Sequence, residues 1–332
     1  MKKIILSGMR PTGRLHIGHW VGALSNWVKL QDEYDCCFMV ADWHAFMSEY
    51  KTPGTIREAM YDNVADWLSW GIDPEKSVVF VQSEVPEHLE LYAVLSAMTP
   101  VGWLMRCPTY KDQINQLQEK EINTHAFLGY PALQTADIAL YGAHCVPVGE
   151  DQVPHLELAR EVIRRFNAIS DQDVLTEPQP LLTSVPRLMG LDGRKMSKSY
   201  DNCIYLDEEE TVLNKKIMGM FTDPARQRKT DPGDPDACNL FSCYSIFIPS
   251  EYHDQIRKGC TSASAGCVEC KRLLLESLDK ILGDKRRKKR ELLADRKIID
   301  RILDKGAQQA RVRACKTIEK VRSALGCFRD GR

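Results

Sequence analysis

The chain has 332 residues, of which 43% are hydrophobic and 27% are charged, and its formal net charge is −1. This composition is typical of a globular protein with one or two domains. No apolar run reaches the ~20 residues of a membrane helix, and the N-terminal apolar stretch ends at Gly8, too early for a signal peptide. We therefore expect a cytoplasmic protein with no membrane partner. The balanced charge excludes a basic field over the whole surface, although the basic run at 285–290 predicts a local basic surface or, equally well, a solvated helix face.

Strands and helices alternate in the first half of the chain. Short apolar runs at 3–6, 36–40, 78–81 and 145–148 predict buried strands. Apolar residues at helical spacing predict helices that begin near residues 16, 56 and 153, the second ending close to Gly71. Continuous apolar strands alternating with helices indicate an α/β fold, a Rossmann-like doubly wound parallel sheet with helices on both faces.

Two regions interrupt this alternation. Residues 99–144 are predicted to form a mostly helical insertion. After about residue 200 the strand signals fade, and the pattern predicts helices over 211–220 and 273–303 with a loop over 222–237. We therefore expect a Rossmann-like catalytic domain over 1–200, which includes the insertion, and an all-helical domain over 201–332.

Two histidines stand where the first predicted strand gives way to a helix. His16 and His19 are three residues apart, so they share one helix face, and Gly18 between them lets a ligand approach the backbone. The free N–H groups and the dipole of a helix N-terminus favour anions. The imidazoles can therefore donate hydrogen bonds to phosphate oxygens, although two structural histidines at a turn would have the same sequence.

A second candidate for phosphate binding lies in a polar loop far along the chain. It reads Lys195-Met196-Ser197-Lys198-Ser199. Its lysines can close on negative charge that develops in a transition state. Taken alone, an exposed basic loop would be the better explanation of this segment.

Together, the two segments resemble the paired signature of the class I aminoacyl-tRNA synthetases, in the expected order. The resemblance implies that His16 and His19 steady the α-phosphate of ATP while an amino acid carboxylate attacks it. It also implies that Lys195 and Lys198 hold the β- and γ-phosphates and then pyrophosphate, with Mg²⁺ sharing the charge. These four side chains are the catalytic candidates.

Three further segments, residues 7–13, 130–138 and 146–152, are similar to the tryptophanyl-tRNA synthetases of the bacterial type, and the similarity runs over almost the whole chain. It implies an ATP site in which Asp151 suits the ribose hydroxyls and Lys111 reaches the phosphates from the insertion. It also implies a homodimer formed through the insertion, and a C-terminal domain that binds the tRNA anticodon. The implied ATP-binding residues are Arg10, Pro11, Thr12, Gly18, His19, Lys111, Gly149, Glu150, Asp151, Leu188, Lys195, Met196, Ser197, Lys198 and Ser199.

The same resemblance implies where tryptophan binds. The implied contacts are Met9, Tyr130, Gln134, Asp137 and Gln152, with Asp137 accepting the indole N–H. The chain departs from many bacterial members in having Arg10 in place of Gln and Gln134 in place of Met. Arg10 could pair with the substrate carboxylate or with a phosphate, and the sequence leaves both open.

Four of the twelve cysteines are grouped. Structural disulfides are rare in the cytosol, and the spacing of Cys260, Cys267 and Cys270, with Cys238 upstream, argues for a metal before a disulfide. Four thiolates fit tetrahedral Zn²⁺ or a [4Fe–4S] cluster, and spacing alone does not decide between them.

A subset of the tryptophanyl-tRNA synthetases carries a [4Fe–4S] cluster in the anticodon-binding region on a very similar cysteine spacing. The resemblance therefore implies a cluster held by Cys238, Cys260, Cys267 and Cys270, with Zn²⁺ as the alternative. The gap from Cys238 to Cys260 is one residue shorter than in that subset, and Cys243 is also close. We expect Cys238 to be the first ligand because it follows the same Asp-Pro-Gly loop.

Three other functions are possible for a chain with these motifs. A tyrosyl-tRNA synthetase needs partners for a phenol hydroxyl, usually a Tyr with an Asp, whereas tryptophan needs one acceptor, which Asp137 can supply. A nucleotidyltransferase with no tRNA partner does not need a long helical C-terminal region with a basic run. A non-catalytic relative would have lost a histidine or a loop lysine, and none is lost. The resemblance thus implies activation of L-tryptophan with ATP, giving tryptophanyl-adenylate and pyrophosphate, and transfer of tryptophan to tRNA(Trp).

Overall fold

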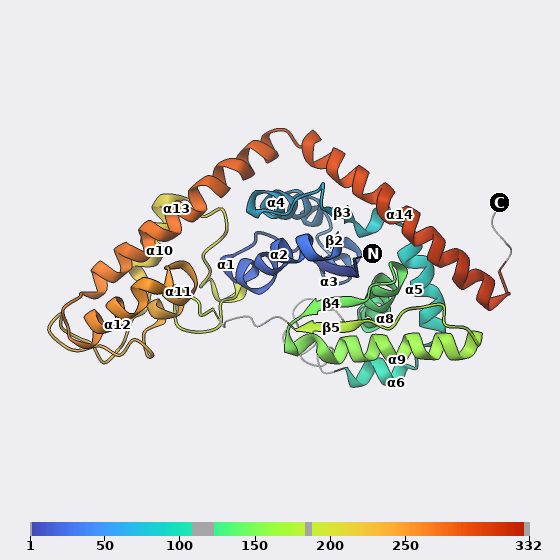
Figure 1. Ribbon diagram of the computed structural model, residues 1–332, viewed down its shortest axis with the longest axis horizontal. Helices are drawn as coiled ribbons and strands as arrows, with labels where there is room; N and C mark the ends of the chain where they lie inside the picture. Colours follow the sequence, from blue (N-terminus) through green and yellow to red (C-terminus); the bar gives the residue numbers. More distant parts are fainter. Residues whose placement is uncertain (1, 108–122, 183–187, 329–332) are drawn as a thin grey trace. The chain divides into compact units, whose positions relative to one another are not determined.

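The computed structural model describes residues 2–107, 123–182 and 188–328 (Figure 1). The chain divides into two compact units: unit 1 comprises 1–13, 26–184 and 295–332, and unit 2 comprises 14–25 and 185–294. This division differs from the boundary predicted at residue 200, because 14–25 belongs to unit 2 and 295–332 belongs to unit 1. Among the described residues, no helix is long and apolar enough to span a membrane.

A parallel sheet forms the centre of unit 1, with the strand order β3-β2-β1-β4-β5 among the described residues. This order confirms the predicted Rossmann-like sheet. The edge strand over 179–182 has no predicted counterpart. Its four residues include Pro180, and none of them is fully buried, so it lacks the pattern of a buried strand. The strands are β1 (Ile4–Met9), β2 (Asp35–Val40), β3 (Ser77–Val81), β4 (Cys145–Val148) and β5 (Gln179–Leu182).

Helices cover both faces of this sheet. The helices of unit 1 are α2 (Ser25–Glu33), α3 (Asp42–Glu49), α4 (Gly54–Trp70), α5 (Glu87–Met98), α6 (Val101–Arg106), α8 (His125–Leu140), α9 (Val153–Ser170) and α14 (Lys297–Leu325). Short 3₁₀ turns, η2 (Gln82–Glu84) and η4 (Glu150–Gln152), follow β3 and β4. The predicted insertion accordingly contains α6 and α8, while residues 108–122 lie outside the described residues.

The alternating side chains of β2 explain how the two faces are filled. Phe38 stacks on Trp27 of α2 with 4.7 Å between the ring centroids, and Trp27 meets Trp67 of α4 edge-on at 5.2 Å. Cys37 and Met39 belong to a buried cluster with apolar residues of α5, α8, α9 and α14. Successive residues of one strand therefore anchor α2 and α4 on one side and the other four helices on the opposite side.

The last helix of the chain packs against the sheet of unit 1. Figure 1 shows α14 alongside β3 and α5. A Cβ atom on Gly306 would lie 1.8 Å from the carbonyl oxygen of Val79, so only glycine permits this approach. The single helix predicted over 273–303 is therefore wrong: α13 ends at Ala294, and α14 begins at Lys297 in the other unit. The break contains no Gly or Pro, so the sequence carries no stop signal there.

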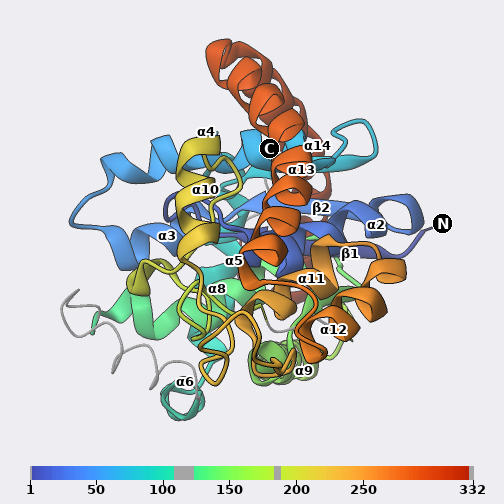
Figure 2. The same ribbon diagram turned by 90° about the vertical axis from the view of Figure 1, so that its left-hand side faces the viewer.

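The described residues of unit 2 form helices and helical turns connected by loops. The unit contains α1 (Ile17–His19), the π-helical turn η1 (Trp20–Leu24), η5 (Lys198–Tyr200), α10 (Glu210–Gly219), α11 (Asn239–Phe247), η6 (Ser250–Tyr252), α12 (His253–Thr261) and α13 (Cys267–Ala294). Figure 2 shows α10 and α11 against α13, which buries Leu274, Leu278 and Leu282. The helix predicted over 211–220 and the loop predicted over 222–237 are confirmed.

Candidate active site and cysteine pocket

The two histidines cap the first helix of unit 2 reciprocally. His16 Nδ1 accepts a hydrogen bond from the Gly18 N–H at 3.1 Å, and His19 Nδ1 accepts one from the His16 N–H at 3.1 Å. Their ring centroids are 3.9 Å apart. A Cβ atom on Gly18 would lie 2.8 Å from the His16 ring, so glycine is needed between them. The predicted sharing of one face is confirmed.

These hydrogen bonds also fix the protons of the imidazoles. A neutral imidazole that accepts at Nδ1 carries its proton on Nε2, a tautomer assigned here from the hydrogen bonds. Burial and the nearby Lys198 lower the pKa of His16 to about 4, and burial, His16 and Lys198 lower the pKa of His19 to about 3. Both rings are therefore neutral near pH 7, and each offers an Nε2–H donor.

The lysine loop belongs to the same unit as the histidines. A Cβ atom on Gly18 would lie 3.7 Å from the sulfur of buried Met196, and Lys198 is near enough to both histidines to affect their pKa values. The structure thus brings together the two signature segments, which are far apart in the sequence. Leu188, another candidate for the ATP site, is buried in this unit.

One buried amide holds the lysine loop. Asn202 accepts the Ser197 N–H at 2.8 Å and donates to the Lys195 carbonyl oxygen at 3.2 Å and to Asp192 Oδ1 at 2.7 Å. The Asn202 amide is also the main reason why the pKa of Asp192 is lowered to about 2. Asn202 is 2% exposed, so its polar atoms are committed to these partners. No sequence motif predicts this role for Asn202.

The remaining ATP candidates follow the ends of strands in unit 1. Arg10, Pro11 and Thr12 come directly after β1, and Gly149 and Glu150 come after β4, where parallel sheets bind their ligands. Lys111 lies outside the described residues, as do the side chains of Asp151 and Ser199.

Asp137, the candidate acceptor for tryptophan, is held by three donors. Its Oδ1 accepts from Gln82 Nε2 and from His88 Nδ1, both at 2.7 Å, and its Oδ2 accepts from His44 Nε2 at 2.8 Å. Burial opposes the charged form of this 3% exposed residue, but the hydrogen bonds from His44 and His88 outweigh it and lower its pKa to about 2. Tyr141 extends the network, since its hydroxyl lies 2.7 Å from His88 Nε2.

A second polar chain links two other tryptophan candidates. The Tyr130 hydroxyl lies 2.6 Å from His155 Nε2, and His155 Nδ1 lies 3.1 Å from Gln152 Oε1. Met9 ends β1, and Gln134 lies half-buried on α8, three residues before Asp137. All five tryptophan candidates therefore belong to unit 1.

Sequence reasoning missed several residues of these networks. His44 and Gln82 follow the ends of β2 and β3, a position at which functional side chains gather, so the predicted strands already contained a signal. His88, Tyr141 and His155 lie within helices or at a helix end, and only the folded structure brings them to the site.

The four candidate cysteines line one pocket in unit 2. Cys238 is the N-cap of α11, Cys260 lies in α12, and Cys267 and Cys270 occupy the first turn of α13. They share the pocket with apolar and aromatic side chains and with Arg226. Cys243 is not part of the lining; it is fully buried, and burial raises its pKa to about 12.

The four thiols fit a metal group by their chemistry, since sulfur ligands suit both zinc and iron–sulfur clusters. Among the described residues, however, no three His, Cys, Asp or Glu side chains are close enough to hold a single metal ion between them. The thiols therefore face a common space without converging on one point. Burial raises the pKa values of Cys260 and Cys270, so these thiols are protonated and uncharged. Binding of a metal would release their protons.

The basic run at 285–290 does not form a uniformly exposed surface. Arg286 and Lys289 are buried and paired with Asp279 and Asp207. The neighbouring Arg287 and Arg290 are exposed, each next to a carboxylate. The prediction of a local basic surface is therefore correct for only part of the run. In α14, too, cations pair with carboxylates of unit 1, such as Arg322 with Glu90 at 2.6 Å.

The chain is similar to known proteins in both sequence and fold. Residues 2–283 match the family described as tRNA synthetases class I (W and Y). The chain is 49% identical to the tryptophan--tRNA ligase of Thermotoga maritima, over 97% of this chain and 98% of that protein. It is 39% identical to the tryptophan--tRNA ligase of Ralstonia nicotianae, over 97% of this chain and 98% of that protein.

The fold is similar to the crystal structure of tryptophanyl-tRNA synthetase from Campylobacter jejuni complexed with ADP and tryptophan. The TM-score is 0.90 at 33% sequence identity, and the match covers 97% of this chain and 99% of the other. Full-length similarity to ligases named for tryptophan, together with the intact histidine and lysine segments, favours the tryptophan branch over the tyrosine branch. The chain therefore belongs to the class I aminoacyl-tRNA synthetases, in the family of the tryptophan--tRNA ligases.

Proposed function

We propose that this chain activates L-tryptophan with ATP, forming tryptophanyl-adenylate and pyrophosphate, and then transfers tryptophan to tRNA(Trp). The observation that carries the proposal is the placement of His16, His19 and Lys198 within one unit, with both imidazoles neutral and protonated on Nε2. Neutral donors suit an α-phosphate that gains charge as a carboxylate attacks it.

The residues of unit 2 handle the phosphates in this proposal. His16 and His19 donate from Nε2 to the α-phosphate, while Lys195 and Lys198 hold the β- and γ-phosphates and the leaving pyrophosphate. Mg²⁺ bound with ATP would share the phosphate charge. Asn202 fixes the loop backbone at both Lys195 and Ser197, so the lysines reach the phosphates from a defined turn.

The residues of unit 1 bind the amino acid. Asp137 Oδ2 accepts one hydrogen bond from His44, and we assign its second acceptor position to the indole N–H. Arg10 is close enough to Tyr130, a tryptophan candidate, for its charge to affect the pKa of that phenol, so we assign Arg10 to the tryptophan carboxylate rather than to a phosphate. The competing explanation is that Asp137 only stabilises the packing of α3, α5 and α8. The variant Asp137→Asn distinguishes this structural role from tryptophan binding.

Pyrophosphate exchange tests the activity directly. Purified protein with ATP and Mg²⁺ is assayed with each of the twenty amino acids in turn. We expect exchange with tryptophan only, followed by charging of tRNA(Trp). Exchange with tyrosine, or with no amino acid, would overturn the proposal.

We further propose that Cys238, Cys260, Cys267 and Cys270 hold a [4Fe–4S] cluster. Support comes from their shared pocket and from the exclusion of Cys243 from its lining. When bound, such a cluster would shape the surface of unit 2 that meets the anticodon; tryptophan activation includes no redox step. Of the predicted anticodon-binding region, 201–332, we propose this role only for the part in unit 2, residues 201–294.

Iron analysis tests this assignment. Anaerobically purified protein should be brown and contain about four irons and four sulfides per chain. Cys267→Ser should remove the metal and reduce tRNA charging more than adenylate formation, whereas Cys243→Ser, the matched control, should keep it. Stoichiometric zinc without iron would overturn the cluster but keep the site. Retention of iron in Cys238→Ser would show that the first ligand is wrong.

A homodimer formed through residues 99–144 is also proposed. Its support is the resemblance together with apolar side chains exposed on α6, where Val101 is 57% and Met105 is 55% exposed. Light scattering should give twice the chain mass, and Met105→Glu should shift the population toward monomer. An unchanged mass in that variant would remove α6 from the interface.

A further inference from the structure

The histidine segment of unit 2 is held along its backbone by residues 203–209. The Ile17 N–H donates to the Ile204 carbonyl oxygen, and the Leu206 N–H donates to the Leu15 carbonyl oxygen, both at 2.9 Å. Between these bonds, His16 and Tyr205 form an antiparallel bridge. The position of His16 is therefore set by residues 204–206, which contain none of the candidate catalytic groups.

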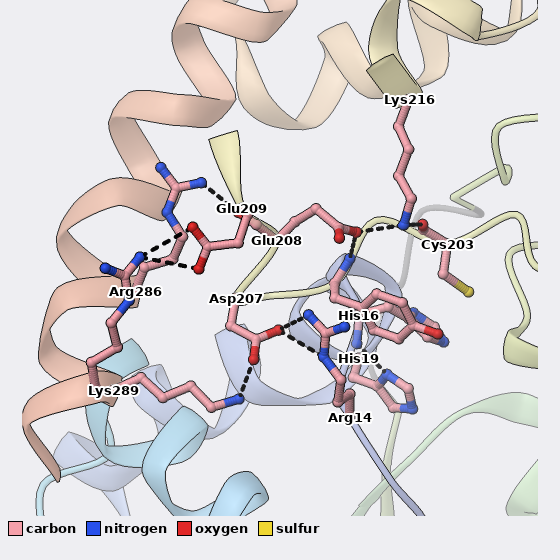
Figure 3. A network of polar contacts seen from close by, with 12 residues as sticks. Arg14, His16, His19, Cys203, Asp207, Glu208, Glu209, Lys216, Arg286 and Lys289 are labelled. Carbon is pink, nitrogen blue, oxygen red and sulfur yellow. Dashed lines mark hydrogen bonds and ion pairs between the residues drawn. The ribbon is translucent and has the colours of Figure 1, made fainter. Parts of the chain in front are cut away.

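Asp207 connects this pairing to two cations (Figure 3). Its Oδ1 accepts from Arg14 Nε at 3.1 Å and from Arg14 Nη2 at 2.5 Å, immediately before the histidine segment. Its Oδ2 accepts from Lys289 Nζ at 3.0 Å. Lys289 is 3% exposed, so its charge is stabilised by fixed partners and not by water.

The next residue adds a second attachment. Glu208 Oε2 accepts from Lys216 Nζ of α10 at 2.5 Å and from the Tyr205 N–H at 3.1 Å. The Glu208 carbonyl oxygen accepts from Arg286 Nη1, and Arg286 is itself buried. Residues 203–209 are thus fastened to α10 by the half-buried Lys216 and to α13 by the buried Arg286 and Lys289 (Figure 3).

A neighbouring ion pair of the same two segments differs in one respect. Arg290 pairs with Glu209 at 3.2 Å, but both side chains are 65% exposed. An exposed pair of this kind contributes little to stability and holds geometry weakly. Lys289 and Arg290 are adjacent on α13 and bind adjacent parts of one segment, so burial is the main difference between them.

We propose that Asp207, together with Lys289, is a positioning pair for adenylate formation. The pair locks Arg14 and residues 204–206 to α13, and so presents the Nε2 atoms of His16 and His19 to the α-phosphate in one geometry. The inference rests on the proposed phosphate-binding role of the histidines. The same helix carries Cys267 and Cys270 in its first turn, about 28 to 33 Å along its axis from Lys289. One rigid element thus joins the cysteine pocket to the histidine segment.

Lys289→Met tests the pair, with Arg290→Met as the matched control. Pyrophosphate exchange is measured against ATP and against tryptophan, with folding checked by circular dichroism. For Lys289→Met we expect kcat to fall about tenfold, because a displaced catalytic group loses rate even when the substrates still bind. The KM for tryptophan should stay within about twofold, and Lys289→Arg, which restores the cation, should recover most of the rate.

The alternatives give different results. If Lys289→Met has the same exchange rate as Arg290→Met, the inference is wrong. It is also wrong if Lys289→Met weakens the use of tryptophan and of ATP equally, because the pair is then only structural. If Lys289→Met does not fold, Asp207→Asn decides, since it keeps the shape of the side chain and removes the charge shared by both cations. His19→Ala separates the two proposals: normal exchange in that variant refutes the histidine role itself, whereas slow exchange with a normal Lys289→Met refutes only the positioning pair.

Discussion

The candidate residues of the two units differ in how far they are already engaged with the rest of the protein. In unit 1, Asp137 accepts hydrogen bonds from Gln82, His44 and His88, so three acceptor positions of its carboxylate are already used within the protein. In unit 2, His16 and His19 use Nδ1 for the backbone and keep Nε2–H as the donor for a ligand. Both arrangements preorganise a side chain, but the first also holds three elements of the fold together.

This difference has a consequence for substitutions. A substitution at Asp137 leaves buried hydrogen-bond donors without their acceptor. It should therefore affect both the binding of tryptophan and the stability of the fold. A change at a group that mainly faces a ligand should affect chemistry with little effect on folding. The comparison also predicts that defects segregate by substrate, with changes at Asp137 affecting tryptophan and changes in the histidine and lysine segments of unit 2 affecting ATP.

The largest effect is expected for Lys198→Ala. Because its contact with the phosphates strengthens in the transition state, exchange should slow by about a thousandfold, while the Kd of tryptophan in equilibrium binding stays unchanged. Lys215→Ala, which removes an exposed cation of α10, is the control. Weakened tryptophan binding in Lys198→Ala would break the segregation of the two substrates.

Asp137→Asn should have the next largest effect. The variant keeps the size of the side chain and loses one acceptor and the charge, so we expect kcat/KM for tryptophan to fall on the order of a hundredfold. The Kd of ATP should hardly change. Asp173→Asn, in an exposed loop of the same unit, serves as the control. Equal losses for both substrates would support the explanation that Asp137 is only structural.

A smaller effect is expected for Asn202→Ala, which frees the loop backbone at Lys195 and Ser197. Exchange should slow by about tenfold, chiefly through the KM of ATP, because the lysines remain but lose their fixed turn. Exposed Asn214 on α10 provides the matched Asn→Ala control. A tryptophan defect of the same size would contradict the assignment of this loop to the phosphates.

The smallest effect is expected from pH. With pKa values lowered to about 4 and about 3, His16 and His19 stay neutral, and the exchange rate attributable to them should change less than about twofold between pH 8 and 6. As the pH falls below 6.5, the unfolded chain takes up protons before the folded one does. The stability due to these neutral rings is therefore present above about pH 6.5 and lost toward pH 4. Urea unfolding of His19→Gln should show a weaker pH dependence; an unchanged one would mean that the pKa of His19 is ordinary.

Much of unit 1 could be predicted from the sequence because β1, β2 and β3 are continuous apolar runs, which few other structures explain. The strand β5 could not, since an exposed edge strand containing Pro180 lacks that pattern. The phosphate candidates were found because the chemistry of each lies in a short contiguous segment.

The partners of those segments were not found, for a common physical reason. Lys289 acts through a contact with the distant Asp207, and Asn202 acts through the folded geometry of its own loop. Nothing in their immediate sequence distinguishes a buried amide or ammonium from an exposed one. The basic run at 285–290 shows this most clearly, since Lys288 and Arg290 are exposed whereas Lys289 between them is buried. Helical periodicity predicts the helix but not which acidic side chains pair with its cations.

The contact between Gly306 and Val79 bears on how the edge of the sheet avoids pairing with a further strand. β3 is an edge strand of the sheet, yet all five of its residues are buried, because α14 lies against its backbone. An uncovered parallel edge would offer a row of amide and carbonyl groups to any extended segment nearby, as a template for aggregation. Helix α14 thus protects the edge of the sheet at β3. Until α14 has been synthesised and has docked, that edge depends on other means of protection during folding.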